Sequence, residues 1–179
     1  MKKSESGFTL IELIVAAAIA SAMVGTTGAM TWRIMTDTQR ANDYLTTAHS
    51  AEVAAFWIGR DTAMADTVIT TGLVSPELLT LGWTEWNYGS SSIYHTVTYS
   101  VENTTDGIGT LKRFYEKSTG ENSTLRIADH IYYNANDTAG TTITSFGNKV
   151  LSLKVISKYG TAQVTQESKT YPRPNFLIR

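Results

Sequence analysis

The feature that most constrains this chain is an apolar run near its N-terminus that contains a single carboxylate. The run extends from Phe8 to about Met30 and follows a short polar leader with two lysines. At 1.5 Å per residue, about 23 helical residues span roughly 35 Å, which is enough to cross the core of a bilayer. Glu12 lies inside this run. Because a charged side chain is costly within a membrane, Glu12 is expected to have a specific partner.

The leader indicates the orientation of this predicted transmembrane helix. Lys2 and Lys3 precede the run, and positive charge favours the cytoplasmic side of a membrane. In a secretory signal the cleavage site follows the apolar region, whereas here Gly7 precedes it. A cut after Gly7 would leave the helix on the mature protein and would create a new α-amino group, on Phe8, as a partner for Glu12. We expect everything after the helix to lie outside the cytoplasm.

The stretch Gly7-Phe-Thr-Leu-Ile-Glu-Leu-Ile14 closely resembles the class III signal of type IV pilins and type II secretion pseudopilins. Gly7, Phe8 and Glu12 match that signal residue by residue. The resemblance implies that a prepilin peptidase cleaves after Gly7 and N-methylates Phe8, and that Glu12 pairs with the Phe8 amine of a neighbouring subunit. It also implies other pilins, an assembly ATPase and a platform membrane protein as partners. The alternative interpretation is an uncleaved single-span anchor.

The helical pattern continues well past the membrane run, and no proline occurs before Pro76. Apolar residues with the three-and-four spacing of an amphipathic helix are Ala41, Leu45, Ala48, Ala51, Ala55 and Ile58, and the face they form is broadened by Phe56 and Trp57. We therefore predict four segments: a cleaved leader (1–7), a transmembrane or filament-core helix (8–30), its amphipathic continuation (31–66) and a β-rich globular head (67–179).

Beyond Thr67 the apolar period changes to two, which is typical of half-buried strands. The predicted strands are 67–73, 77–81, 92–102, 108–117, 124–128, 130–133, 149–158 and 162–170. The turn sequence Asn103–Gly107 predicts a hairpin between the third and fourth of them. The expected fold class is α+β: an antiparallel meander packed on one long helix, as in pilins.

The head also resembles large-head minor pilins related to the J-type minor pseudopilin, over roughly residues 90–175. The order of four segments carries this resemblance: Val97–Val101, Leu111–Phe114, Ile131–Asp137 and Tyr171–Asn175. Pro174 interrupts the Arg-Asn expected at the end of the last segment. The absence of cysteine argues against the disulfide-closed loop of one common major pilin design. The predicted function is a minor pilin or pseudopilin that initiates or caps a filament.

Composition and motifs argue against an enzyme and against a nucleic-acid protein. The formal net charge of −1 provides no overall basic field. His49, His95 and His130 do not have the spacing of a zinc site. The chain also lacks a G-x-S-x-G elbow and a glycine-rich phosphate loop. We therefore expect a structural role rather than a catalytic one.

Three groups of side chains in the predicted head leave other roles open. Clustered oxygen ligands that could suit Ca²⁺, although a plain turn is favoured, are Asp129, Asn134, Asn136 and Asp137. An aromatic group, which could be core, a packing face or an adhesive surface, consists of Trp83, Trp86, Tyr88 and Tyr94. Basic residues that could meet DNA phosphates are Lys112, Arg113, Lys117, Lys149, Lys154 and Lys158. The alternative function is therefore a surface binding module, either a tip adhesin or a DNA-uptake pilin.

Overall fold

The computed structural model describes residues 9–86, 92–137 and 140–174, without the side chain of residue 103. These residues form one long helix and an eight-stranded antiparallel sheet. The elements are α1 (Leu10–Met64), β1 (Thr67–Ile69), β2 (Glu77–Glu85), β3 (Ile93–Thr105), β4 (Ile108–Lys117), β5 (Asn122–Tyr132), β6 (Ile143–Gly147), β7 (Val150–Tyr159) and β8 (Ala162–Thr170).

The chain divides into two compact units, one up to Asn42 and one from Asp43 onward. Helix α1 belongs to both units, since it runs through this boundary. In the described part of the first unit there is only helix, whereas the second unit, called the head below, combines the last part of α1 with the whole sheet.

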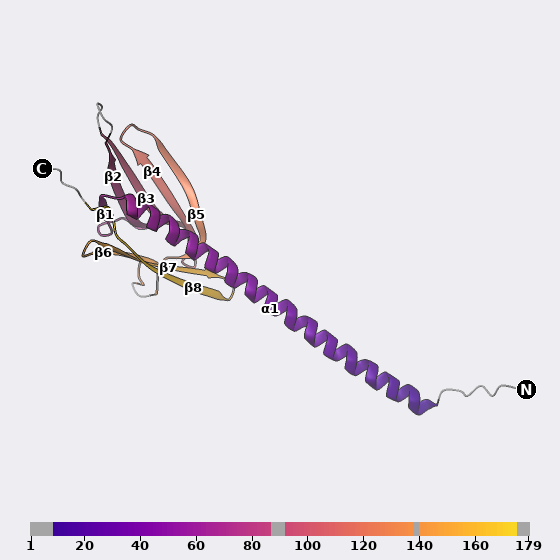
Figure 1. Cartoon of the computed structure of the whole chain (residues 1–179). Helices are drawn as coiled ribbons and strands as arrows, with labels where there is room; N and C mark the ends of the chain where they lie inside the picture. Colours follow the sequence, from indigo (N-terminus) through magenta and orange to yellow (C-terminus); the bar gives the residue numbers. More distant parts are fainter. Residues whose placement is uncertain (1–8, 87–91, 138–139, 175–179) are drawn as a thin grey trace, which may run out of the picture. The chain divides into compact units, whose positions relative to one another are not determined.

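The sheet of the head begins as a meander and then becomes more complex. Strands β1 to β5 pair with their neighbours in sequence order. Strand β5 then pairs with β7 through Ile131 and Ser157, and β7 also pairs with β6 and β8. Figure 1 shows β2–β5 on one side of the last part of α1 and β6–β8 on the other. The predicted α+β fold with an antiparallel sheet around one helix is confirmed.

The main difference between the predicted strands and the structure is at the β6–β7 turn, whose two left-handed residues are not glycine. The Asp106-Gly107 turn, with φ values of 53° and 78°, closes the predicted β3–β4 hairpin. The β6–β7 turn has the same left-handed geometry at Asn148 and Lys149, with φ values of 53° and 62°. Strand β6 was not predicted, because a lysine at positive φ is uncommon and gives no turn signal in a sequence. The two strands predicted at 124–128 and 130–133 are the single strand β5.

The buried face of α1 is more polar than its apolar spacing predicts. Its buried residues in the head are Asp43, Thr47, Ser50, Ala51, Ala54, Ile58, Asp61 and Thr62. Three residues placed on the predicted apolar face are exposed instead: Ala41, Leu45, which retains 63% of its accessible surface, and Phe56, which retains 62%. That part of the prediction is wrong. The sheet approaches the side of α1 that carries alanines and hydroxyls, because small side chains allow close packing.

The hydroxyls on this buried face are satisfied by the helix itself. Thr47 Oγ1 donates to the carbonyl of Asp43 and Thr62 Oγ1 donates to that of Ile58, each at 2.6 Å. Such back-bonding lets threonine pack like a small apolar residue. The rest of the core consists mainly of aliphatic side chains from β2, β3, β4, β5 and β7, among them Leu79, Val97 and Val155.

One buried carboxylate ties α1 to the sheet. Asp61 lies in the last turns of α1 and has no accessible surface. Its Oδ2 accepts hydrogen bonds from the Tyr99 hydroxyl at 2.6 Å and from Arg113 Nε at 2.5 Å. Its Oδ1 accepts a longer bond of 3.3 Å from Arg60. In the sequence, Tyr99 lies 38 positions after Asp61 and Arg113 lies 52 positions after it.

The charge states of this group are set by burial and by Asp61. Burial, followed by the negative charge of Asp61, raises the pKa of the Tyr99 hydroxyl well above its ordinary value, so Tyr99 remains a donor. Burial alone would lower the pKa of Arg113, but the hydrogen bond and charge of Asp61 outweigh it and the net pKa is raised. Arg113 therefore stays cationic and neutralises Asp61.

Replacing Asp61 by alanine should strongly destabilise the head. The substitution leaves the Tyr99 hydroxyl and the Arg113 guanidinium without their acceptor, and breaking a buried pair in this way costs about 3–5 kcal/mol. Urea unfolding of the full chain in mild detergent, followed by tryptophan fluorescence, measures the loss. The matched control is Asp37→Ala, since the Asp37–Arg40 pair is exposed and 3.9 Å apart. An equal midpoint for both variants would contradict a stabilising role of the contact.

Replacing Gly160 by alanine should also destabilise the head. Gly160 has φ +57° in the turn between β7 and β8, and a Cβ there would meet the carboxylate of Asp43 on α1. The left-handed conformation alone costs about 1–2 kcal/mol for a residue with a side chain. Gly147→Ala is the control, since its Cβ would meet no atom within 4 Å. The same urea titration should show a lower midpoint only for Gly160→Ala.

Candidate functional site

The first unit presents an apolar helix that no other described residue covers. An 18-residue window of α1 has a mean hydropathy of 1.9, and none of it is buried. By length and composition, α1 is the one helix among the described residues that could cross a membrane. Large apolar side chains are exposed from Leu10 at 78% to Met35 at 66%. This surface can be covered only by lipid or by other protein, which fits membrane anchoring.

Glu12 has an internal partner at the start of this helix. Its Oε2 accepts hydrogen bonds from the Thr9 backbone N–H at 2.9 Å and from the Thr9 hydroxyl at 2.8 Å. A carboxylate that returns three residues to the first amide is half of a capping box. Negative charge in the first helical turn is also favoured by the helix dipole. Sequence reasoning missed Thr9, although Thr-x-x-Glu is the signal for this cap.

Hydroxyl groups along the exposed helix are satisfied in the same local way. Each donates to a backbone carbonyl three or four residues earlier, at 2.7–3.1 Å: Ser21, Thr26, Thr27, Thr31, Thr36 and Thr38. A hydroxyl bonded to its own helix needs no partner in an apolar medium. Between Leu10 and Met30 of the described helix, Glu12 is the one charged residue.

Gly7 and Phe8, the predicted cleavage and methylation residues, lie outside the described residues. Glu12 is described, on the first turn of α1. The assignment of these three residues to processing and to filament register stays a prediction from the resemblance.

The four predicted calcium ligands lie in two local arrangements. Asp129 accepts hydrogen bonds from Thr110 at 3.0 Å and from Arg126 at 2.7 Å. Asn134 Oδ1 caps the amide of Asn136, and Asp137 Oδ1 accepts from the Gly140 amide. The second arrangement consists of hydrogen bonds within one turn, and the calcium site stays a prediction that the structure does not test. In the described part of the chain, no three histidine or carboxylate side chains gather as for a metal ion.

The three histidines lie in three different environments. His49 is exposed on α1. His95 is buried: its ring stacks on Trp83, its Nδ1 contacts the Tyr115 hydroxyl at 2.6 Å, and its Nε2 contacts Glu85 at 3.0 Å. The ring of His130 packs on that of Tyr159. His95 is therefore part of an aromatic layer of the head.

The predicted aromatic group is divided by the sheet. Trp83 lies beside His95 in the register of β2 and β3, whereas Tyr94 precedes His95 and points to the opposite face. There, the Tyr94 hydroxyl lies over Gly82 and contacts Thr67 Oγ1 at 3.3 Å. Trp86 is 81% exposed, and Tyr88 lies outside the described residues. The group is thus no single patch in the described part of the head.

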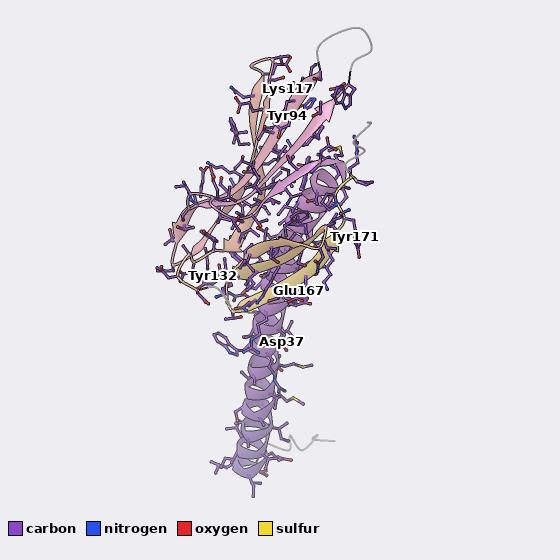
Figure 2. The ribbon with its side chains drawn as sticks, turned by 90° about the vertical axis from the view of Figure 1, so that its left-hand side faces the viewer. Asp37, Tyr94, Lys117, Tyr132, Glu167 and Tyr171 are labelled. Atoms are coloured by element: carbon purple, nitrogen blue, oxygen red, sulfur yellow. The ribbon has the colours of Figure 1, made fainter. Side chains whose placement is uncertain are left out.

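Most of the basic residues considered for DNA are held by partners within the head. Lys112 pairs with Glu102 at 2.6 Å, and Lys117 pairs with Glu121 at 2.5 Å. Figure 2 shows Lys117 near Tyr94, at one end of the sheet. The hydrogen bond to Lys112 lowers the pKa of Glu102, and that to Glu121 raises the pKa of Lys117. The Nζ of Lys158 lies 3.3 Å from the centroid of the Tyr132 ring.

Comparison with known proteins identifies one motif. Residues 2–27 match the family model of the prokaryotic N-terminal methylation motif. No curated protein and no solved structure matches the chain. The motif supports a type IV pilin-like or pseudopilin subunit that is processed by a prepilin peptidase and assembles with other pilins. It also contains both Thr9 and Glu12.

Removing the Thr9 hydroxyl should loosen the start of α1. Thr9→Val keeps the shape and the backbone N–H but deletes one of two bonds to Glu12, whereas Thr9→Ser keeps both. Loss of a cap costs about 0.5–2 kcal/mol, so amide exchange at Glu12 and Leu13 should accelerate about two- to thirtyfold. Hydrogen exchange of the full chain in detergent micelles measures the rate. Equal protection in Thr9→Val and Thr9→Ser would show that the hydroxyl does not hold the helix start.

Proposed function

We propose that this chain is a minor pilin or minor pseudopilin, a structural subunit that initiates or caps assembly of a type IV pilus or a type II secretion pseudopilus. The observation that carries the proposal is the uncovered apolar helix with a single carboxylate, directly within the methylation motif. A large cysteine-free β head supports the minor role. The proposed role is mechanical rather than catalytic, because the matching motif is that of structural pilin-type subunits.

Assembly replaces lipid around the helix by the helices of neighbouring subunits. The apolar side chains from Leu10 to Met35 make this exchange nearly neutral in hydrophobic terms, because lipid tails are as apolar as the helices. Glu12 then supplies selectivity. An attraction between its carboxylate and the Phe8 amine of a neighbour is strong in a medium of low dielectric constant and depends steeply on distance, so it sets the axial register.

The proposed topology follows from the same helix. Before assembly the chain spans the cytoplasmic membrane once, with the leader inside and the head outside. An assembly ATPase and a platform membrane protein would then move the subunit from the bilayer into the filament, which spans the periplasm or reaches the cell surface. Head residues are accordingly available for contacts with other subunits.

A tip adhesin or DNA-uptake pilin stays the alternative. It rests on the basic residues of the head, and the internal contacts of Lys112, Lys117 and Lys158 give it little support. Binding of DNA that weakens as salt is raised would favour this alternative.

Two substitutions test the proposal at separate steps. Gly7→Val should block processing, so mass spectrometry should find the leader retained, whereas the native chain should begin at a methylated Phe8. Glu12→Ala should be processed normally, but the amount incorporated into filaments should fall about tenfold or more. This is the ratio expected for the loss of one charge-assisted hydrogen bond. Asp37→Ala is the control for a charge removed from the same helix. Native incorporation of Glu12→Ala would contradict the register role, and a Phe8 terminus in Gly7→Val would contradict the cleavage site.

A further inference from the structure

Three cations of the head, Lys149, Lys169 and Arg173, have no ion pair, side-chain hydrogen bond or ring contact with a described residue, and Lys169 lines a different groove from the other two. Lys112, Arg113, Lys117 and Arg126 each pair with a carboxylate. The side chains of Lys149 and Arg173 are both exposed. Their positive charges are therefore available to an outside partner.

Lys149 and Arg173 line the same groove. It has a volume of about 480 Å³ and lies between the start of β1, the β6–β7 turn and the segment after β8. Its apolar wall includes Phe146, 41% exposed, and Tyr171, 70% exposed. Figure 2 shows Tyr171 at the edge of the head. Asp66 also lines the groove, but its Oδ2 accepts the amide of Thr84 at 3.0 Å. The groove thus fits an apolar side chain beside an anion.

The exposed face of α1 in the head carries this combination. Glu52 and Phe56 are one turn apart, so their side chains lie next to each other on the helix surface. Phe56 is 62% exposed, and Glu52 is exposed with no ion pair to a described residue. Arg60, one turn further, is directed to the ring of Trp57 at 3.9 Å and to Asp61. Its charge is thus engaged within its own chain.

We propose that the Glu52–Phe56 face of one subunit docks into the Lys149–Arg173 groove of a second copy of this chain. Phe56 packs against Phe146 and Tyr171, and Glu52 meets the two cations. The proposal rests on the proposed function of the chain as a filament subunit. It adds the surfaces through which two heads contact each other.

The positions of the two surfaces give the contact a direction. They are different patches, so the interface is heterologous, and it requires two copies of the chain next to each other in the filament. The groove lies at the end of α1, where the Arg173 amide bonds to the carbonyl of Ala65. Residues 52–56 precede Ala65 by about 14–20 Å of helix. A neighbour shifted along the helix axis by this distance keeps both helices parallel, as anchorage in one membrane or filament requires.

Cysteine cross-linking of the full chain tests the contact, since the native chain contains no cysteine. Chains with Phe56→Cys and chains with Tyr171→Cys are produced in the same cells, and filaments are treated with a bifunctional maleimide. The control pair is Phe56→Cys with Thr165→Cys, an exposed residue on β8 that does not line the groove. We expect a cross-linked dimer for the first pair and at most trace amounts for the control.

Charge reversal is a second test, and it examines the pairing of Glu52 with the cations of the groove. Glu52→Lys or Arg173→Glu alone should lower the dimer yield about two- to fivefold, the range for one exposed ion pair, and the two together should restore it. Filaments that contain the chain but yield no Phe56–Tyr171 dimer would overturn the head contact while leaving the proposed function standing. A dimer yield unchanged by either charge reversal would overturn the pairing of Glu52 with the groove. Absence of the chain from all filaments would overturn the proposed function and the contact together.

Discussion

The head depends on the contact of Asp61 with Tyr99 and Arg113. A carboxylate in the last turns of a helix is disfavoured by the helix dipole, and a buried one is costly unless it is paired. Here one oxygen of Asp61 accepts from both β3 and β4, and the guanidinium of Arg113 balances its charge. The cost of burial is met only when the helix lies in one place against the sheet. The contact therefore fixes the helix position as well as stabilising it.

A polar buried face has a consequence for the opposite side of the helix. Because alanines and back-bonded threonines pack against the sheet, large side chains such as Leu45 and Phe56 remain outside. In the first unit the exposed side chains between Leu10 and Met30 are mostly apolar. Helix α1 thus presents apolar surface in both units. This distribution is expected of a subunit that is completed by its neighbours, and it links the fold of the head to assembly.

Local patterns in the sequence predicted much of this structure. Alternating apolar residues predicted the strands around Val97 and Val155, and the Asp106-Gly107 pair predicted a hairpin, because each signal depends on a few adjacent residues. Strand β6 escaped prediction because its turn uses Lys149 at positive φ. The exposure of Phe56 escaped it because helical spacing identifies which residues share a face but not which face meets a partner.

The sequence by itself determined the apolar helix, the carboxylate at Glu12 and the methylation motif that supports processing by a prepilin peptidase, since these depend on composition and short spacing. Only the tertiary structure decided which side of α1 is buried, that Asp61 meets Arg113, and that Lys149 and Arg173 share a groove. These contacts join residues far apart in the chain, and their selection depends on the total packing and charge balance of the head. No local sequence pattern contains that balance.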